Sequence, residues 1–579
     1  MGTPGPSLTD LVVRVLPDEP GIDKEFDYLV PRELGALVRV GTRVRVELHG
    51  RRIGAWVVAL DVQPPAGVDL RAVAKVTGWG PPEEVIDLAG WAAWRWAGRR
   101  ASFLRTASPP RAVTDLRRPG RAGHPLPGPP DELVAEAFTG LRSVLRLPPA
   151  ADLYPVALAA AARGNALVVA PSEREARLLA TRLRRAGAPI ALVPEQWARA
   201  AAGATVVGTR AAAWAPVADL AAAVVVDEHD EGHRQEQAPT WHARDVVAER
   251  AERAGAPCVL VSPVPTLEAQ DWGRLVTPSR SAERAGWAVL DVIDRRQEPP
   301  AAGLYSERLV PFLRGEGRVV CVLNRTGRAR LLVCAACGAT ARCERCDAAV
   351  VQDREGALVC TRCETTRPVV CQACGGGRLK TLRLGVTRAA EDLAALVREP
   401  VAEVWAGSEG EPQERVVVGT EAALHRVPSA DVVAFLDVDQ ELLAPRYRAP
   451  EQALALLARA ARLVGGRHRG GRVVVQTRSP DHEVLAAALH ADPGRLVKAE
   501  RSRRAELGFP PATALAVVSG ASAEAYVEAL GRPLGLEVLG PRDGAWLLRA
   551  PDHRTLCDAL AATPRPGGRL RIEVDPVRT

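Results

Sequence analysis

Apolar and polar residues alternate along the first part of the chain, in four short runs between residues 8 and 78. The runs are LVVRVLP, FDYLVP, TRVRVELHG and RIGAWVVALDV, and turn-forming residues separate them. Because successive side chains of a strand point to opposite faces, this period predicts a small β-barrel or sandwich. Residues 85–104 predict one or two helices rich in Trp and Ala. Residues 109–130, crowded with Pro, Gly and Arg, predict a flexible linker.

After residue 131 the pattern changes to short, wholly apolar runs separated by Ala-rich helical stretches. The first series is ALVVAP (166–171), ATVVGTR (204–210), AAAVVVDE (221–228) and PCVLVSP (257–263). The second is RVVCVLN (318–324), VAEVWAG (401–407), RVVVGTE (415–421), VVAFLDVD (432–439) and RVVVQT (472–477). This rhythm predicts two α/β lobes, each with a parallel sheet and crossover helices.

These patterns predict a multidomain α/β protein, in agreement with a length of 579 residues, which exceeds what one core supports. The last segment alternates strands with helices, as a small α+β domain does. The expected parts are an N-terminal domain (1–108), a linker (109–130), a first lobe (131–295), a second lobe (296–490) with an insert at 333–380, and a C-terminal domain (491–579).

The insert carries the strongest chemical signal, because eight of the eleven cysteines form four Cys-x-x-Cys pairs there. Two pairs together complete the tetrahedral sulphur shell that a structural Zn²⁺ prefers. Thirteen residues separate the second pair from the third, but only five and seven separate the other neighbours, which favours nested pairing. We expect one zinc on Cys334, Cys337, Cys371 and Cys374, and a second on Cys343, Cys346, Cys360 and Cys363.

Disulfides and an iron–sulfur cluster are the alternatives to zinc. Disulfides need an oxidising compartment, whereas residues 1–20 lack the basic and apolar regions of an export signal, so a cytoplasmic protein is expected. Iron–sulfur clusters usually take thiolates at other spacings. Structural zinc contributes on the order of 10 kcal/mol to the folding of small modules, so we interpret these cysteines as scaffold. The isolated Cys258, Cys321 and Cys557 are expected to be core residues.

Overall charge says little about partners. The formal net charge of +7 is spread over the whole length without a basic run, so it does not by itself distinguish a nucleic-acid-binding protein. No apolar run approaches the roughly 18 residues of a membrane span, and no membrane association is expected.

An acidic segment, Asp227-Glu228-His229-Asp230, follows one of the apolar runs of the first lobe. Ligand-binding and catalytic residues of α/β proteins lie just beyond the carboxyl ends of the strands. An Asp-Glu pair there resembles the Walker B element of a nucleoside triphosphatase, in which one carboxylate holds Mg²⁺ and the next polarises the attacking water. An acidic surface turn is the alternative.

The order of these motifs resembles one family over nearly the whole chain. The segments that carry the resemblance are GTRAAAWAP, VVVDEHDEGHRQEQAPTWHARD, SPVPTLEA, LNRTGRA, the four Cys-x-x-Cys pairs, GTEAALHRVPSADVVAFLDVD and VVVQTRSPDH. They resemble primosomal protein N′ (PriA), a family of bacterial replication-restart helicases. The resemblance implies two RecA-like helicase lobes with a double zinc insert in the second. It also implies the nested cysteine pairing.

The resemblance implies DNA-binding residues as well. EFDYLVP and VRVELHGRRIG are similar to the family's domain that grips the 3′ end of a nascent strand, and Phe26, Asp27, Gly50 and Arg71 fall where that pocket contacts the terminal nucleotide. Phe26 could equally be a core residue. Trp241, followed by His242, resembles an aromatic-rich loop that couples single-stranded DNA to the ATP site, with a buried structural Trp as the alternative.

The chain departs from the family at the nucleotide site. No Gly-Lys-Ser or Gly-Lys-Thr occurs, and the place of the phosphate loop reads LPPAADLYPVALAAAARG (147–164), in which two prolines remove N–H donors. The family's QVAGRAGR falls on residues 459–466, where Leu463 and Gly466 replace both arginines. Arg462 and Arg467 could take the place of the two motif arginines only if the alignment with that motif is shifted. An arginine finger alone is worth roughly 10³ in rate, so ATP and Mg²⁺ are doubtful ligands.

The sequence therefore predicts a restart protein that binds forked and single-stranded DNA without an active ATPase. The resemblance implies primosome proteins, the replicative helicase with its loader, and single-strand-binding protein as partners of a monomer. Two alternatives stay open. One is an active ATP-dependent 3′-to-5′ helicase with a non-standard nucleotide site, using Asp227 and Glu228. The other is a zinc-stabilised interaction scaffold that barely touches DNA.

Overall fold

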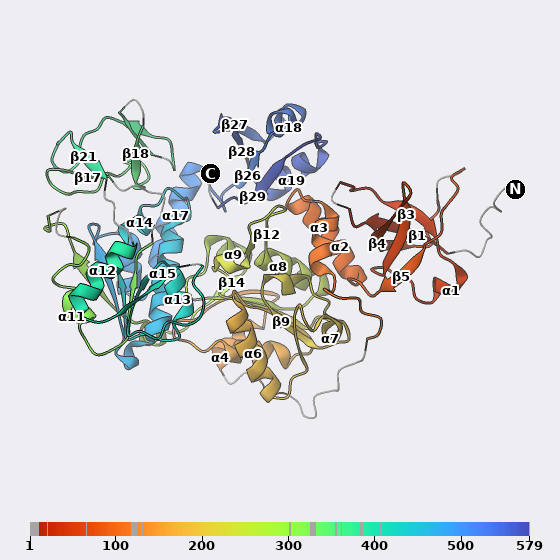
Figure 1. Ribbon diagram of the computed structural model, residues 1–579, viewed down its shortest axis with the longest axis horizontal. Coiled ribbons are helices and arrows are strands. Elements are labelled where there is room, and N and C mark those ends of the chain that lie inside the picture. Colours follow the sequence, from red (N-terminus) through yellow and green to blue (C-terminus); the bar gives the residue numbers. More distant parts are fainter. Residues whose placement is uncertain are drawn as a thin grey trace.

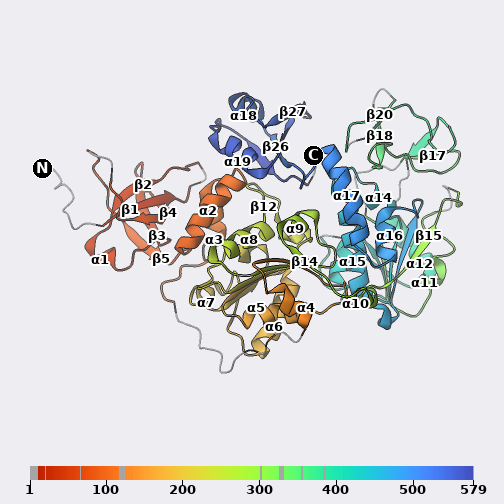
Figure 2. The same cartoon turned by 180° about the vertical axis from the view of Figure 1, so that it is seen from behind.

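The computed structural model describes residues 11–19, 21–64, 67–116, 126, 128, 131–299, 303–324, 332–353, 356–360, 362–381, 386–405 and 407–577. A β-barrel lies at one end of the molecule and the second α/β lobe at the other (Figures 1 and 2). The first lobe lies between them. A cysteine-rich module and the C-terminal domain lie along one side (Figure 1). Most of the predicted linker and most of the LNRTGRA segment fall outside the described residues.

The N-terminal barrel is antiparallel, with strand order β2-β1-β4-β3-β5. Its elements are β1 (Val12–Pro17), β2 (Phe26–Leu29), α1 (Arg32–Gly35), β3 (Arg43–Leu48), β4 (Arg51–Leu60) and β5 (Lys75–Gly78). The alternating pattern buries a row of valines, including Val13, Val44 and Val57. The Tyr28 hydroxyl donates to the Glu47 carbonyl at 2.8 Å, which ties β2 to β3 across the barrel.

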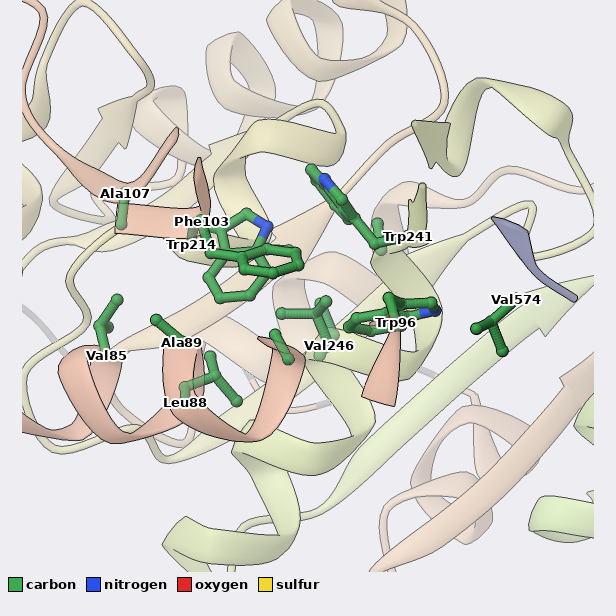
Figure 3. Packing of buried hydrophobic residues seen from close by; sticks show 14 of the residues in the cluster. Val85, Leu88, Ala89, Trp96, Phe103, Ala107, Trp214, Trp241, Val246 and Val574 are labelled. Atoms are coloured by element: carbon green, nitrogen blue, oxygen red, sulfur yellow. The ribbon is translucent and has the colours of Figure 1, made fainter. Parts of the chain in front are cut away.

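Two helices, α2 (Glu83–Arg95) and α3 (Arg100–Ala107), join the barrel to the first lobe. Apolar residues of both helices, among them Leu88 and Phe103, belong to the same hydrophobic cluster as residues of lobe 1 and of the C-terminal strand β29 (Arg571–Val574) (Figure 3). Phe103 lies 5.3 Å from Trp214, measured between ring centroids, and Trp214 meets Trp241 edge to face at 5.6 Å. A continuous core therefore fixes the barrel relative to the first lobe.

Lobe 1 is a parallel sheet of order β14-β6-β13-β10-β7-β9-β8. Its strands are β6 (Arg142–Arg146), β7 (Ala166–Val169), β8 (Ile190–Leu192), β9 (Thr205–Gly208), β10 (Ala222–Val226), β13 (Cys258–Ser262) and β14 (Arg274–Val276). Its helices are α4 (Glu132–Ala137), α5 (Tyr154–Ala161), α6 (Glu173–Arg185), α7 (Trp197–Ala201), α8 (Ala243–Ala254), α9 (Leu267–Trp272) and α10 (Arg280–Gly286). A separate two-stranded ribbon joins β11 (Arg234–Gln235) to β12 (Trp241–His242).

Lobe 2 repeats this design with order β15-β25-β24-β16-β23-β22. Its strands are β15 (Val289–Asp294), β16 (Val319–Val322), β22 (Val401–Val404), β23 (Val416–Gly419), β24 (Val432–Phe435) and β25 (Arg472–Thr477). Its helices are α11 (Val310–Leu313), α12 (Val386–Val397), α13 (Ala422–Arg426), α14 (Asp439–Leu442), α15 (Ala449–Val464) and α16 (Glu483–Leu489), and α17 (Gly494–Leu507) packs against α15 and α16.

The cysteine-rich module is inserted between β16 and α12. It contains β17 (Leu332–Cys334), β18 (Val350–Gln352), β19 (Leu358–Cys360), β20 (Thr366–Arg367) and β21 (Leu379–Thr381). The C-terminal domain is an antiparallel sheet of order β27-β28-β26-β29 with two helices. Its elements are β26 (Ala514–Ser519), α18 (Ala523–Leu530), β27 (Glu537–Arg542), β28 (Ala545–Ala550), α19 (His553–Ala562) and β29 (Arg571–Val574).

The predicted fold class is therefore confirmed: a β-rich N-terminal domain, two α/β lobes that each contain a parallel sheet, a double tetracysteine insert in the second, and an α+β C-terminal domain. Within the described ranges, no helix is long and apolar enough to cross a membrane.

Candidate functional site

The eight cysteines of the insert form two groups of four. Cys334, Cys337, Cys371 and Cys374 make one group, and Cys343, Cys346, Cys360 and Cys363 make the other. In each group all four Sγ atoms lie within 4.8 Å of one another. The closest pairs are 3.6 Å apart in the first group and 3.4 and 3.5 Å apart in the second. Four sulphurs at the Zn–S bond length around a tetrahedral ion are about 3.8 Å apart, so both groups are consistent with zinc.

One backbone pattern builds all four cysteine turns. The carbonyl of the first cysteine accepts from the N–H four residues later, for example at 3.0 Å from Gly338 to Cys334. That later residue has positive φ in every turn: Gly338, Asp347, Glu364 and Gly375. The left-handed residue turns the chain back so that both thiols of a pair face the same side. The local fold therefore pre-forms a metal-binding knuckle four times.

The Walker B-like pair lies at the carboxyl end of β10, between the two lobes. Glu228 is fully buried and its carboxylate has three partners in lobe 1. It accepts from the Thr266 backbone N–H at 2.8 Å, from the Thr266 hydroxyl at 3.0 Å and from Arg244 at 3.2 Å. All three bonds come from the loop after β13 and from α8, so this carboxylate already has partners within its own lobe.

Asp227 is paired with an arginine of the other lobe. Both carboxylate oxygens accept from the guanidinium of Arg462 on α15, one of them at 2.8 Å. Asp227 is 1% exposed. Burial acts to raise the pKa of the Asp227 carboxyl, but Arg462 holds it well below its usual range. The carboxylate that would hold Mg²⁺ in a Walker B element is thus in a bidentate ion pair.

The loop after β6 is the segment where the sequence analysis expects the phosphate loop of a nucleotide site. Pro148 and Pro149 offer no N–H, the Ala150 N–H donates to the Gly286 carbonyl at 3.1 Å, and the Ala151 N–H donates to Pro148 at 2.9 Å. Asp152 accepts from the Tyr154 N–H at the start of α5 and pairs with Arg182 at 2.7 Å. The Asp152 carboxylate therefore takes up an N–H at the helix start that could otherwise bind an anion.

Further polar contacts close the cleft between the lobes. Arg459 pairs with Glu175 at 3.5 Å, and Gln452 donates to Glu231 at 2.9 Å. Deeper in the cleft, Arg448 pairs with Glu268 at 2.6 Å. Burial acts to raise the pKa of Glu268, but the positive charges led by Arg448 lower it to about 2. The two lobes are therefore joined directly, side chain to side chain.

The four predicted DNA-end residues lie on the barrel. Asp27 pairs with Arg14 on the neighbouring strand at 2.8 Å, and Arg71 pairs with Glu47 at 2.6 Å in an exposed position. Gly50 forms the tip of the β3–β4 hairpin with φ +75°, and an added Cβ there would meet no atom within 4 Å. Phe26 is half-buried at the edge of the barrel core. Their contact with DNA stays a prediction.

Trp241 lies in the core that joins α3, lobe 1 and the C-terminal strand (Figure 3). Only 5% of it is exposed, and its ring packs on Trp214. This burial agrees with the structural alternative considered from the sequence, and contact of Trp241 with DNA stays a prediction.

Sequence reasoning did not find Arg462 as the partner of Asp227, because the two are 235 residues apart. It also did not predict β6, whose run Arg-Ser-Val-Leu-Arg is too short and too charged to be recognised as a buried strand. β6 sets the position of the loop that follows it.

Known relatives match most of the chain, and a family model matches its N-terminal domain. Residues 14–109 match the family model of the 3′DNA-binding domain (3'BD) of PriA. The chain is 29% identical over 586 residues to the probable replication restart protein PriA of Mycobacterium tuberculosis, covering 90% of this chain and 89% of that protein. It is 29% identical to the Mycobacterium leprae protein of the same name, covering 96% and 99%. A solved DEAD box protein of Methanococcus jannaschii is 10% identical, with a TM-score of 0.30 and coverage of 63% and 88%.

Proposed function

We propose that this chain, a relative of the PriA replication restart proteins, recognises abandoned replication forks and recombination intermediates and directs primosome assembly there without an ATP-driven motor. Its similarity to PriA over nine-tenths of its length and the 3′DNA-binding domain match support the restart role. Binding is the mechanism: arginines supply salt-dependent affinity for phosphates, and the barrel selects a free 3′ end.

One observation supports the loss of the motor more than any other. Arg462 of lobe 2 holds both carboxylate oxygens of Asp227, and its Nε donates to the carbonyl of Pro149 in the loop that replaces the phosphate cradle. The same guanidinium thus contacts both the Walker B-like carboxylate and the loop where the sequence places the eroded phosphate-binding motif, and these contacts support the proposal. Helicase lobes must separate and close during each ATP cycle, and this ion pair opposes that separation.

The cysteine groups have a structural part in this proposal. We propose two bound Zn²⁺ ions, one on each tetracysteine group. With four protein ligands each, neither ion would keep an open position for water, so the metal would fold the module and supply no catalysis. The module would present a docking surface for primosome proteins, the replicative helicase with its loader, and single-strand-binding protein.

The direct test is a binding titration on zinc-loaded full-length protein. We expect tighter binding to a fork with a 3′-hydroxyl at the junction than to the same fork with a 3′-phosphate, and weaker binding to blunt duplex. Equal affinity for all three would instead support the interaction scaffold that barely touches DNA.

A second candidate function is that of an active ATP-dependent DNA helicase. Asp227 and Glu228 still lie side by side at the end of β10, which is the feature that favours a non-standard nucleotide site. Strand displacement from a labelled fork that requires ATP and disappears in Glu228→Ala would establish this helicase. No displacement by the wild-type chain agrees with the binding function.

A further inference from the structure

The two tetracysteine groups differ in how far the rest of the protein covers them. In the first group Cys337 and Cys374 are exposed, whereas in the second group three cysteines are buried and Cys363 is half-buried. The second group also takes part in a hydrophobic cluster of the module, on which Leu507 of helix α17 packs. The chain therefore presents one set of thiols to solvent and keeps the other in an apolar core.

The second group is also fastened to lobe 2. The Ala349 N–H donates to the Leu443 carbonyl at 2.7 Å. The guanidinium of Arg362 donates to the Cys346 carbonyl at 3.2 Å and to the Arg446 carbonyl at 2.7 Å. These contacts hold the second group against the lobe and leave only one of its four cysteines appreciably exposed.

That half-buried cysteine, Cys363, is also protected chemically. Its Sγ lies 3.2 Å from the hydroxyl of Thr365. A hydroxyl that donates to a thiolate stabilises the negative charge on the sulphur, which makes the sulphur a weaker nucleophile. Among the described residues, no side-chain hydroxyl lies at hydrogen-bond distance from a sulphur of the first group, whose close contacts are those between its own cysteines.

The first group has little cover. A Cβ added at Gly376 would lie 3.4 Å from the sulphurs of both Cys334 and Cys374. Because glycine has no side chain, nothing at this position shields the two sulphurs. Measured between Sγ atoms, Cys334 lies 3.6 Å from Cys374, and Cys337 lies 3.6 Å from Cys371. Each exposed cysteine therefore has a buried cysteine beside it.

We propose that the first group is a site of reversible oxidation by hydrogen peroxide, and that the second group resists it. Susceptibility of cysteines to oxidation follows their thiolate character and their exposure. The inference rests on the proposed zinc ions, because zinc binding keeps cysteines as thiolates. The sulphur of Cys374 or Cys337 attacks one oxygen of the peroxide, the O–O bond breaks, and a sulfenic acid and a hydroxide ion form. The neighbouring thiolate of Cys334 or Cys371 then displaces hydroxide and forms a disulfide.

In balance, two thiolates and one hydrogen peroxide give one disulfide and two hydroxide ions. The two sulphurs are oxidised and the peroxide oxygens are reduced. Two of four ligands are lost, so the first group no longer holds zinc. Its cysteines lie on the module's first and last strands, β17 and β21, and on the turns beside them, so these ends loosen while the second group keeps the module on lobe 2. A thiol reductant and zinc reverse the change.

The test follows zinc release from full-length protein in hydrogen peroxide with a chromogenic zinc chelator. Zinc content is first measured by elemental analysis. After oxidation, free thiols are blocked, disulfides are reduced and labelled, and the labelled cysteines are mapped by mass spectrometry. The buried Cys258, Cys321 and Cys557 are internal controls that stay unlabelled as long as the protein is folded.

We expect a first phase that releases about one zinc ion per chain, with a disulfide between Cys374 and Cys334 or between Cys337 and Cys371, and a slower phase from the second group. Release of both ions together, or of the second group's zinc first, would overturn the inference while the zinc assignment stands. Fewer than two ions before oxidation would instead overturn the zinc assignment.

Two matched variants locate the sensitive ion. Cys374→Ser and Cys363→Ser each remove a solvent-accessible ligand from one group, and each should start with one zinc ion per chain. We expect peroxide to release the remaining zinc promptly from Cys363→Ser and slowly from Cys374→Ser. The reverse order would contradict the inference. If a variant fails to fold, the two phases and the disulfide map of the wild-type protein decide.

Discussion

The cysteine-rich module and the cleft between the lobes both contain polar side chains typical of a known site, but they differ in what those side chains contact. In the module, four thiols of each group lie within 4.8 Å of one another, on turns that repeat one backbone pattern. In the cleft, Asp227 and Glu228 are paired with Arg462 and Arg244. Motif residues alone therefore do not define a site. Their partners decide whether they can bind a ligand or serve to hold the protein together.

Removal of a zinc ligand from the cysteine-rich module is expected to have the largest effect, on zinc content and on folding of the module. Cys360→Ser removes one ligand from the buried group, and the zinc content measured by elemental analysis should fall from two ions to one per chain. Structural zinc contributes on the order of 10 kcal/mol to such modules, so the module should unfold and become sensitive to protease.

Cys557→Ala is the control for this change, because Cys557 is buried in the C-terminal domain and belongs to neither group. Two ions per chain in both variants would contradict the assignment of Cys360 as a ligand.

Breaking the ion pair between Asp227 and Arg462 in the cleft is expected to have the next largest effect, on the free energy of unfolding. Arg462→Ala leaves the buried carboxylate of Asp227 without its partner, and breaking such a pair typically costs about 3–5 kcal/mol. The midpoint of the urea unfolding transition that includes lobe 1 should fall accordingly. In Arg467→Ala, by contrast, an exposed side chain that donates to a backbone carbonyl is removed, and the midpoint should hardly change. Equal midpoints for the two variants would show that the lobes are not held by Asp227.

The N-terminal barrel is a third region to compare. There the Asp27 carboxylate is paired with Arg14 and is also predicted to contact the 3′ end of DNA. Asp27→Ala should reduce the preference for a 3′-hydroxyl fork over a 3′-phosphate fork about tenfold, the loss expected for a charged hydrogen bond. Arg14→Ala breaks the same ion pair but keeps the carboxylate, so its preference should persist. If both variants lose the preference equally, Asp27 acts only through the barrel fold.

The change with the smallest effect at neutral pH concerns His482, because its effect develops only on acidification. Burial lowers the pKa of His482 to about 3 from the ordinary 6.5, so the folded protein binds that proton less readily than the unfolded chain. Its stability contribution is complete above about pH 6.5 and is lost as pH falls toward 3. His482→Asn keeps an acceptor for the Val484 N–H that His482 Nδ1 caps, and it should flatten this part of the stability profile. A profile with unchanged slope would contradict the lowered pKa.

The sequence predicted the lobes and the cysteine groups because both leave local signals. Buried parallel strands give apolar runs, and the distances between Cys-x-x-Cys pairs limit how they combine. The left-handed residues of the cysteine turns could be predicted at only two of the four positions. Glycine at 338 and 375 indicates a positive φ, whereas Asp347 and Glu364 give no such indication in the sequence.

The state of the cleft could not be predicted, because it depends on packing between distant segments. Arg462 was recognised only as a substitute that a register shift would require, and its pairing with Asp227 follows from how α15 packs on lobe 1. The role of Trp241 was left open for the same reason, since its burial depends on helix α3 and on the C-terminal strand.

The most direct test of the absent motor is steady-state ATP hydrolysis by zinc-loaded full-length protein that binds a model fork, measured with and without that fork. The account predicts that wild type does not exceed the Glu228→Ala background under either condition, while fork affinity is the same for both. Fork-stimulated turnover that Glu228→Ala removes would contradict it, and would show that Arg462 leaves Asp227 when nucleotide binds.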